Sequence, residues 1–341
     1  MHKKTITLGL QGGGAHGAFT WGVLDRLLEE EAIDIEGISG ASAGAMNAVV
    51  MAHGLTVGGR EGARQALKDF WDSISLRLPF SIMPDHPVHA SDLAAHSELP
   101  ASLRPLLALP RYFSPYQLNP FDINPLREVL LRQVDFERLR ADCPLRLFIA
   151  TTQVSTGTLK LFRNKQLTVD VLLASACLPL LHHAIEIHGE VYWDGGLTSN
   201  PPLFPLISKC AARDMMVVLL NPEPTLKVPK TAGEILHRLT EMGFSSSFFT
   251  ELQALTLAQR EARRGWLAFG RIERRLRQLN LHVIESQQLM GQLGKHSKMN
   301  VKPAFLLGLY EEGRARASRW LASNAQALGT RSSFRLSKLF A

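Results

Sequence analysis

The sequence predicts an α/β fold with a mainly parallel central sheet, and three segments carry that prediction. Residues 5–10 alternate like a strand, and residues 18–31 then place apolar side chains at helical spacing. Residues 34–39 form a second candidate strand, which a helix of small residues through 46–52 follows. Residues 214–222 are nearly all apolar, as is typical of a strand buried in a parallel sheet. The initial β-α-β-α order predicts helices on the faces of that sheet.

The remaining segments complete the expected framework. Frequent prolines between residues 74 and 120 predict an irregular, lid-like insertion. Beyond about residue 232 the pattern predicts only helices. The further elements expected are a helix over 124–141, strands over 145–154 and 158–163, a helix over 169–181 that stops near Pro179, a strand pair over 185–196 with its turn at 188–190, and helices over 233–243, 250–265 and 303–324.

Composition and charge narrow the class of protein. The chain is 45% hydrophobic and 20% charged, as in a globular protein. No apolar run approaches the length of about 18 residues that a membrane-spanning helix needs. The net charge is +7, divided into about +11 from residue 258 onward and about −4 before it. Because no recognised nucleic-acid-binding fold accompanies this basic region, we expect no nucleic-acid partner.

The cysteines and the first residues indicate the compartment. Cys143, Cys177 and Cys210 are an odd number, far apart and without C-x-x-C spacing. The apolar stretch after Lys3 and Lys4 is short and runs into glycines, so we interpret it as a strand and not as a signal peptide. We therefore expect a reducing, cytoplasmic setting.

The stretch GGGAHG at residues 12–17 separates the first strand from the first helix. It fits G-x-G-x-x-G, a pattern whose backbone N–H groups and following helix surround an anion such as a dinucleotide pyrophosphate. A dinucleotide-binding fold, however, needs an acidic residue where the second strand ends. Asp34 and Glu36 come too early for that position, and Ser42 follows the strand instead.

Ser42 is the centre of GASAG at residues 40–44, which fits the nucleophile elbow G-x-S-x-G. That motif requires a strand before it and a helix after it, and both are predicted here. The serine sits in a strained turn, which is tolerable only when its neighbours lack bulk. All four neighbours are Gly or Ala, so the sequence predicts Ser42 as a nucleophile.

A serine hydroxyl needs a base that takes its proton. The sequence has 12 histidines, so a Ser-His-Asp triad stays open by count, but none of the candidates stands in a recognisable catalytic setting: His182, His183 and His237. Asp194 is the better candidate, because it ends a strand and precedes two glycines that let other backbone approach closely. An ordinary Asp-Gly turn is the alternative. The rigid Asn-Pro-Pro sequence at 200–202 favours the catalytic interpretation.

These motifs together resemble the patatin-like phospholipase family. The resemblance covers about residues 5–208 and rests on the three motifs at 12–17, 40–44 and 194–196, in the family's order, with support from ASACLPL at 174–180. It implies a three-layer α/β/α fold and a Ser42–Asp194 dyad without histidine. It also implies hydrolysis of lipid acyl esters through an acyl-enzyme, with no metal and no cofactor.

The resemblance also assigns roles to the motif residues. The oxyanion hole would be formed by backbone N–H groups of Gly12, Gly13 and Gly14, and the supporting positions are His16, Gly17, Gly40, Gly44, Gly195 and Gly196. His16 departs from the family, which usually has Arg or Lys there. A fixed charge is thus replaced by a group that titrates near neutrality. His16 is then either a neutral hydrogen-bonding group that orients the loop, or a sign of a different substrate or weaker activity.

The resemblance, the proline-rich stretch and the distribution of charge together predict a domain organisation and a set of partners. Residues 5–208 form the catalytic domain with the insertion at about 74–120, and residues 209–341 add the last strand and a basic helical extension. The expected partners are a lipid ester and, through the insertion and the basic helices, the surface of a membrane or lipid granule. Two alternatives stay open: a non-catalytic lipid- or granule-surface-binding protein on the same fold, and an NAD(P)-binding oxidoreductase.

Overall fold

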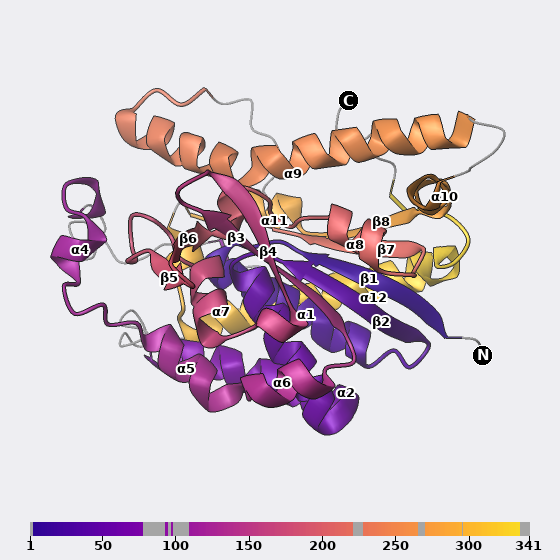
Figure 1. Cartoon of the computed structure of the whole chain (residues 1–341), viewed down its shortest axis with the longest axis horizontal. Helices are drawn as coiled ribbons and strands as arrows, with labels where there is room; N and C mark the ends of the chain where they lie inside the picture. Colours follow the sequence, from indigo (N-terminus) through magenta and orange to yellow (C-terminus); the bar gives the residue numbers. More distant parts are fainter. Residues whose placement is uncertain are drawn as a thin grey trace.

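A computed structural model describes residues 3–77, 93–94, 97, 109–220, 228–264, 270–294 and 296–334. Most of the predicted insertion over 74–120 lies outside the described residues. The described residues contain one eight-stranded sheet with the order β5-β6-β3-β2-β1-β7-β8, in which β4 pairs with β3 away from this path (Figure 1). The strands are β1 Lys4–Leu10, β2 Ile33–Gly40, β3 Arg146–Gln153, β4 Thr158–Arg163, β5 Ile185–Ile187, β6 Glu190–Asp194, β7 Asp214–Leu219 and β8 Asn280–Glu285.

The sheet is mainly parallel, which confirms the predicted fold class. Strands β3, β2, β1, β7 and β8 run in one direction, and β4 and β6 pair with β3 in the opposite direction. Strands β5 and β6 form the predicted hairpin, whose turn has His188 and Gly189 at positive φ. The α-helices are α1 Gly17–Leu28, α2 Ala43–Arg77, α4 Pro115–Leu118, α5 Pro125–Gln133, α6 Phe136–Asp142, α7 Val169–Ser175, α8 Phe204–Lys209, α9 Ala232–Arg264, α10 Arg271–Gln278, α11 Gln287–Gln292 and α12 Pro303–Asn324.

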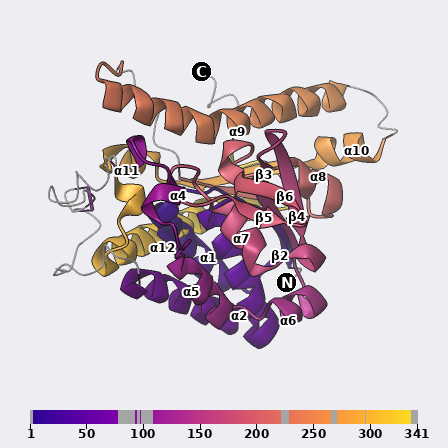
Figure 2. The same cartoon turned by 60° about the vertical axis from the view of Figure 1, so that its left-hand side comes forward.

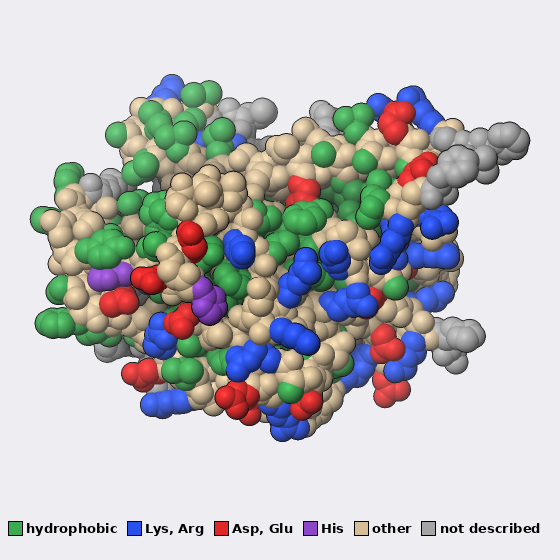
Figure 3. All heavy atoms as spheres, in the orientation of Figure 1, with side chains coloured by type: hydrophobic (Ala, Val, Ile, Leu, Met, Phe, Trp, Pro, Cys, Tyr) green, Lys and Arg blue, Asp and Glu red, His purple; other side chains and the backbone are tan. Residues whose placement is uncertain are grey.

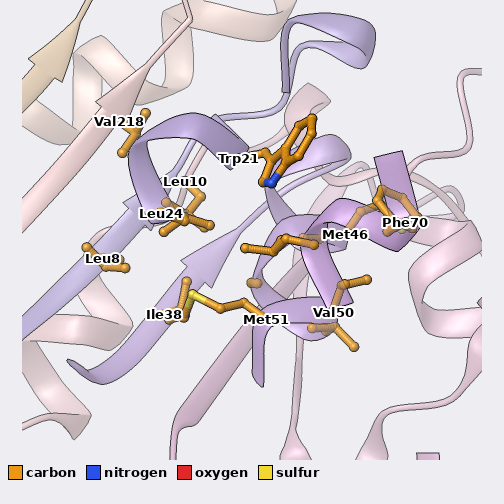
Figure 4. Packing of buried hydrophobic residues seen from close by; sticks show 14 of the residues in the cluster. Leu8, Leu10, Trp21, Leu24, Ile38, Met46, Val50, Met51, Phe70 and Val218 are labelled. Carbon is orange, nitrogen blue, oxygen red and sulfur yellow. The ribbon is translucent and has the colours of Figure 1, made fainter. Parts of the chain in front are cut away.

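Helices cover both faces of the sheet, so the molecule has three layers (Figures 1 and 2). Alternate residues of β7 show why: Met216 and Val218 join the core beneath α1, α2 and α12, whereas Met215 and Val217 join a second core beneath α8 and α9. Figure 4 shows the first core, in which side chains from the strands meet those of α1 and α2. Each large aliphatic side chain buried there contributes about 1.5–3 kcal/mol.

Helix α12 packs against α1 in the first core, although it lies almost 300 residues later in the chain. The two helices approach so closely that a Cβ on Gly22 would press on the carbonyl oxygen of Tyr310, and a Cβ on Gly313 would press on that of Phe19. Only glycine permits backbone to meet backbone in this way. Residues from both ends of the chain therefore build one core.

The structure differs from the predicted elements at several places. The helix expected over 124–141 is divided, because Val134 is extended and Asp135 caps α6 by accepting from the N–H of Arg138 at 3.0 Å. The helix expected to stop near Pro179 already ends at Ser175.

The C-terminal region is largely helical, as predicted, with two corrections. Helix α9 is continuous where two helices were expected. Strand β8 lies where only helices were expected, and it extends the sheet beyond β7. Among the described residues, no helix has the length and apolar character needed to cross a bilayer.

Candidate active site

Ser42 lies in the turn between β2 and α2 with a positive φ of 53°. A non-glycine residue in this region is strained, so neighbouring contacts must hold it there. A Cβ on Gly40 would lie 2.7 Å from the carbonyl carbon of Gly44, and a Cβ on Gly44 would press on the carbonyl oxygen of Leu10. The small residues around Ser42 therefore let the turn close against β1.

Ser175, at the end of α7, holds the backbone of this turn. The N–H of Ser42 donates to the carbonyl oxygen of Ser175 at 3.1 Å and lies 3.0 Å from its hydroxyl oxygen. Ser175 is fully buried, so both acceptors are fixed in place. The sequence offered ASACLPL only as support for the resemblance, and the structure gives its serine a definite contact.

Asp194 ends β6 with its side chain fully buried. Its Oδ1 accepts from the N–H of Gly196 at 2.7 Å. Among the described residues, Oδ2 has no partner with hydrogen-bond geometry. The Ser42 hydroxyl is nevertheless close enough to act on the carboxyl as a donor. The structure thus brings the two predicted residues together, with one carboxylate oxygen uncommitted.

Burial raises the pKa of Asp194 from 3.8 to about 7. The donors from Gly196 and Ser42 act in the opposite direction and offset only part of this effect. A carboxyl with a pKa near neutrality can accept a proton and return it at physiological pH.

The two glycines after Asp194 let this loop pack tightly. A Cβ on Gly195 would press on the carbonyl oxygen of Ala150 in β3, and a Cβ on Gly196 would lie 2.6 Å from the Phe244 ring. Phe244 belongs to α9, so a helix from the C-terminal region lies directly over the carboxyl loop.

The glycine loop between β1 and α1 lies beside the serine. A Cβ on Gly12 would be 2.7 Å from the Cβ of Ser42. The N–H of Gly12 donates to Oδ1 of Asn200 at 2.6 Å, so this donor is already committed. The N–H groups of Gly13 and Gly14 have no acceptor among the described residues. These two groups are therefore available as donors beside Ser42.

Asn200 links three segments of the site. Besides accepting from Gly12, its Nδ2 donates to the carbonyl oxygen of Phe244 at 3.2 Å. The Asn-Pro-Pro sequence predicts a rigid loop around the carboxylate, and no pattern in it indicates this clamp on the glycine loop. Glu251 of α9 adds a second clamp by accepting from the N–H groups of Leu203 and Phe204 at 2.8 and 2.7 Å.

His16 is buried at the start of α1 and contacts the C-terminal region. Its Nε2 lies 2.8 Å from the hydroxyl oxygen of Ser297. Burial, and to a lesser degree the charge of Lys298, lower the pKa of His16 to about 3. The imidazole is therefore neutral at physiological pH. Of the two roles left open for His16, the structure favours the neutral hydrogen-bonding group. The next motif residue, Gly17, packs against Ala43 and Trp71.

The other histidines weighed from the sequence have partners elsewhere. His183 Nε2 lies 3.2 Å from the carbonyl oxygen of Pro115, and His237 Nε2 lies 3.3 Å from Glu241. His182 is partly buried, and its Nδ1 has no partner among the described residues. None of the three has a described contact with Ser42.

The described residues contain one Ser-His-Asp hydrogen-bonded cluster, and it lies where strand β7 begins and not where the parallel strands end. His282 bonds Asp214 through Nε2 and Ser333 through Nδ1, both at 2.9 Å. Asp214 begins β7, whereas Ser42 follows the end of the parallel strand β2. Asp214 also accepts from the N–H of Gly329, so the cluster fastens the segment after α12 to the sheet.

Within the described part of the chain, no group of three or more His, Cys, Asp or Glu side chains is placed to hold a metal ion. The three cysteines are free thiols, with Cys177 and Cys210 buried and Cys143 partly buried.

The sequence matches the family model "Patatin-like phospholipase" over residues 8–207, which is more than half of the chain. The chain belongs to the patatin-like phospholipase family. Membership of this family makes it a lipid acyl hydrolase. The match ends before β7, so the C-terminal elements that cover the site lie beyond it.

Solved structures give more distant likenesses. VipD from Legionella pneumophila is 16% identical, with a TM-score of 0.43 over 94% of this chain and 67% of that one. The heterodimeric ExoU–SpcU complex of the Pseudomonas aeruginosa type III secretion system is 14% identical, with a TM-score of 0.32 over 96% of this chain and 60% of that one. The full-length SpcU–ExoU complex from the same organism is 14% identical, with a TM-score of 0.30 over 99% and 84%. No curated protein matches the sequence.

Proposed function

We propose that this patatin-like phospholipase cleaves lipid esters with a Ser42–Asp194 dyad through an acyl-enzyme. The observation that carries the proposal is the pairing of an elbow serine with a fully buried carboxyl whose Oδ2 is uncommitted. Asp194 takes the proton of the Ser42 hydroxyl while Oγ bonds to the ester carbonyl carbon. Collapse of the tetrahedral adduct breaks the bond to the alcohol, which leaves with that proton. Water then repeats the sequence and releases the fatty acid.

The free N–H groups of Gly13 and Gly14 support a site for the negative charge that develops on the carbonyl oxygen. A donor of this kind contributes about 2.7–4 kcal/mol to the transition state in a comparable hydrolase. Gly12 belongs to the same loop, but its N–H serves Asn200, so we assign it to holding the loop in shape. The N-terminus of α2 adds a partial positive charge behind Ser42.

The reaction is tested with a water-soluble nitrophenyl ester and a fluorophosphonate label. We expect labelling of the wild type at Ser42, and loss of both labelling and hydrolysis in Ser42→Ala. Asp194→Asn should lower hydrolysis by at least about a hundredfold, as the loss of a general base does. Ser208→Ala, in α8, is the matched control and should behave as wild type. Wild-type rates in both site variants would refute the dyad.

The same assay separates the alternatives. A folded wild type that binds lipid vesicles without hydrolysing any ester would indicate a non-catalytic lipid-binding protein. Saturable NAD or NADP binding without fluorophosphonate labelling would indicate the oxidoreductase, but β2 leads to Ser42 and not to the acidic residue that a ribose needs.

We further propose that substrate is taken from a lipid surface. Exposed apolar side chains support this, and they come from two neighbouring segments: Tyr112, Phe113, Tyr116, Leu118, Phe121 and Ile123 near α4, and Ile235, Leu236, Leu239 and Met242 in the first half of α9. Both segments lie at the end of the molecule toward which the parallel strands run (Figure 1), and hydrophobic side chains gather there in Figure 3. A large exposed apolar patch commonly marks a contact surface.

Sedimentation with phosphatidylcholine vesicles tests this contact. The double variant Phe121→Ser and Ile123→Ser should lose vesicle binding, because both side chains are exposed and apolar, yet hydrolyse a water-soluble ester at the wild-type rate. Val57→Ser, an exposed apolar position in α2, is the control. Equal vesicle binding by all of these proteins would refute a role for this surface.

A further inference from the structure

The short helix η8, Ser297–Met299, packs directly on the glycine loop. Gly14 has a positive φ of 59°, and a Cβ there would press on the carbonyl oxygen of Lys298. The hydrogen bond between His16 and Ser297 joins the same two segments two residues after Gly14. A segment from beyond the family match thus forms part of the wall beside the free N–H groups of Gly13 and Gly14.

Lys298 brings a positive charge to this wall. Its side chain is partly buried, and no described residue forms an ion pair or hydrogen bond with its ammonium group. Glu241 of α9 is the carboxylate that faces it. That carboxylate pairs instead with His237 at 3.3 Å and Arg238 at 3.4 Å. A lysine ammonium is strongly hydrated, so burying it without a partner is unfavourable.

The side chain of Lys298 leaves the backbone directly beside the loop, because its Cβ lies 3.5 Å from the position that a Cβ on Gly14 would take. Its charge lowers the pKa of His16, which precedes Gly17 at the start of α1. Burial lowers the pKa of Lys298 itself, while Glu241 opposes that effect. Since His16 is neutral, Lys298 is the positively charged side chain that the described structure places against the glycine loop.

We propose that Lys298 stabilises the oxyanion of the reaction electrostatically. This inference rests on the proposed function. As the bond between Ser42 Oγ and the carbonyl carbon forms, the carbonyl oxygen gains negative charge beside Gly13 and Gly14. The ammonium form of Lys298 transfers no proton in this step and is attracted to this charge more strongly in the transition state than in the ground state. The C-terminal region then supplies the charge that position 16 lacks.

Steady-state hydrolysis of a water-soluble nitrophenyl ester tests the proposal without the complication of a lipid surface. Lys298→Met should lower kcat about tenfold, because a remote unit charge is removed, while KM changes less than about twofold. Lys298→Arg keeps the charge and should stay within about threefold of the wild type. Lys302→Met, at the start of α12, is the matched control and should leave kcat unchanged.

Two results would overturn the proposal. One is a wild-type kcat in folded Lys298→Met, and the other is an equal loss in Lys298→Met and Lys298→Arg, which would indicate packing and not charge. If Lys298→Met does not fold, Lys298→Gln serves instead, because it removes the charge and keeps a polar side chain. It should show the same loss of kcat, and a wild-type kcat in this variant would overturn the proposal. Fluorophosphonate labelling of Ser42 is measured alongside, because its absence in wild type refutes the proposed function itself.

Discussion

Asp194 should destabilise the folded protein at neutral pH, and replacing it with Asn should reveal by how much. Burial raises its pKa from 3.8 in a model peptide to about 7. Between these values the folded state keeps a proton that the unfolded chain releases. The stability that the protonated Asp194 carboxyl contributes is therefore fully present below about pH 4 and is lost as the pH rises to about 7. Asn has the shape of the protonated carboxyl but does not ionise, so Asp194→Asn avoids this loss.

The size of the effect follows from the two pKa values. At about 1.4 kcal/mol per pH unit, the interval from 3.8 to about 7 corresponds to about 4 kcal/mol. Asp194→Asn should therefore exceed the wild type in free energy of unfolding by about 2 kcal/mol at pH 5 and about 4 kcal/mol at pH 8. The variant should at the same time be inactive, because its amide cannot act as a base.

Urea denaturation at pH 5, 6, 7 and 8 measures this difference directly. Asp142→Asn, at an exposed carboxyl that ends α6, is the control and should follow the wild-type curve at every pH. A difference that does not grow with pH, or a variant less stable than the wild type at pH 8, would refute the reasoning. Either result would mean that the carboxyl ionises in the folded protein at little cost.

Three further outcomes are expected. In the wild type, kcat/KM should fall about tenfold per pH unit below about pH 7 and be constant above it. If kcat/KM began to fall only near pH 4, the result would contradict the raised pKa of Asp194. Asn200→Ala should lower kcat about tenfold with normal circular dichroism, because Gly12 loses the acceptor that holds its loop. Ser175→Ala should cost about 1 kcal/mol in thermal unfolding, since the Ser42 N–H keeps its carbonyl acceptor.

The parts of the site that the sequence predicted are those encoded over a few consecutive residues. The turn at Ser42 needs small neighbours within two positions, and a strand and a helix on either side, so the pattern of residues 34–52 contains all that is required. The same holds for Asp194 at the end of an alternating strand. The pairing of the two was predicted by comparing candidate bases and from the family resemblance, because local patterns do not reveal contacts over a separation of about 150 residues.

The parts that sequence could not provide depend on long-range packing. Lys298 lies in a short segment without periodicity, and only the fold brings it to Gly14, which is almost 300 residues earlier. Strand β8 is six residues long and follows a strongly basic helix, so nothing local distinguishes it from the helices around it. Asp135 was missed as a boundary because the apolar spacing continues through it, although an aspartate suits a helix N-cap.

The packing of α12 on α1 has a consequence for how the protein is made. When α1 leaves the ribosome, its apolar face is uncovered, because α12 lies almost 300 residues later in the sequence. Strand β8 and Lys298 come shortly before α12 in the sequence, so the sheet beyond β7 and the wall of the glycine loop are also completed late. A nascent chain that ends before Asn324 therefore lacks part of the packing that supports the first core and the glycine loop.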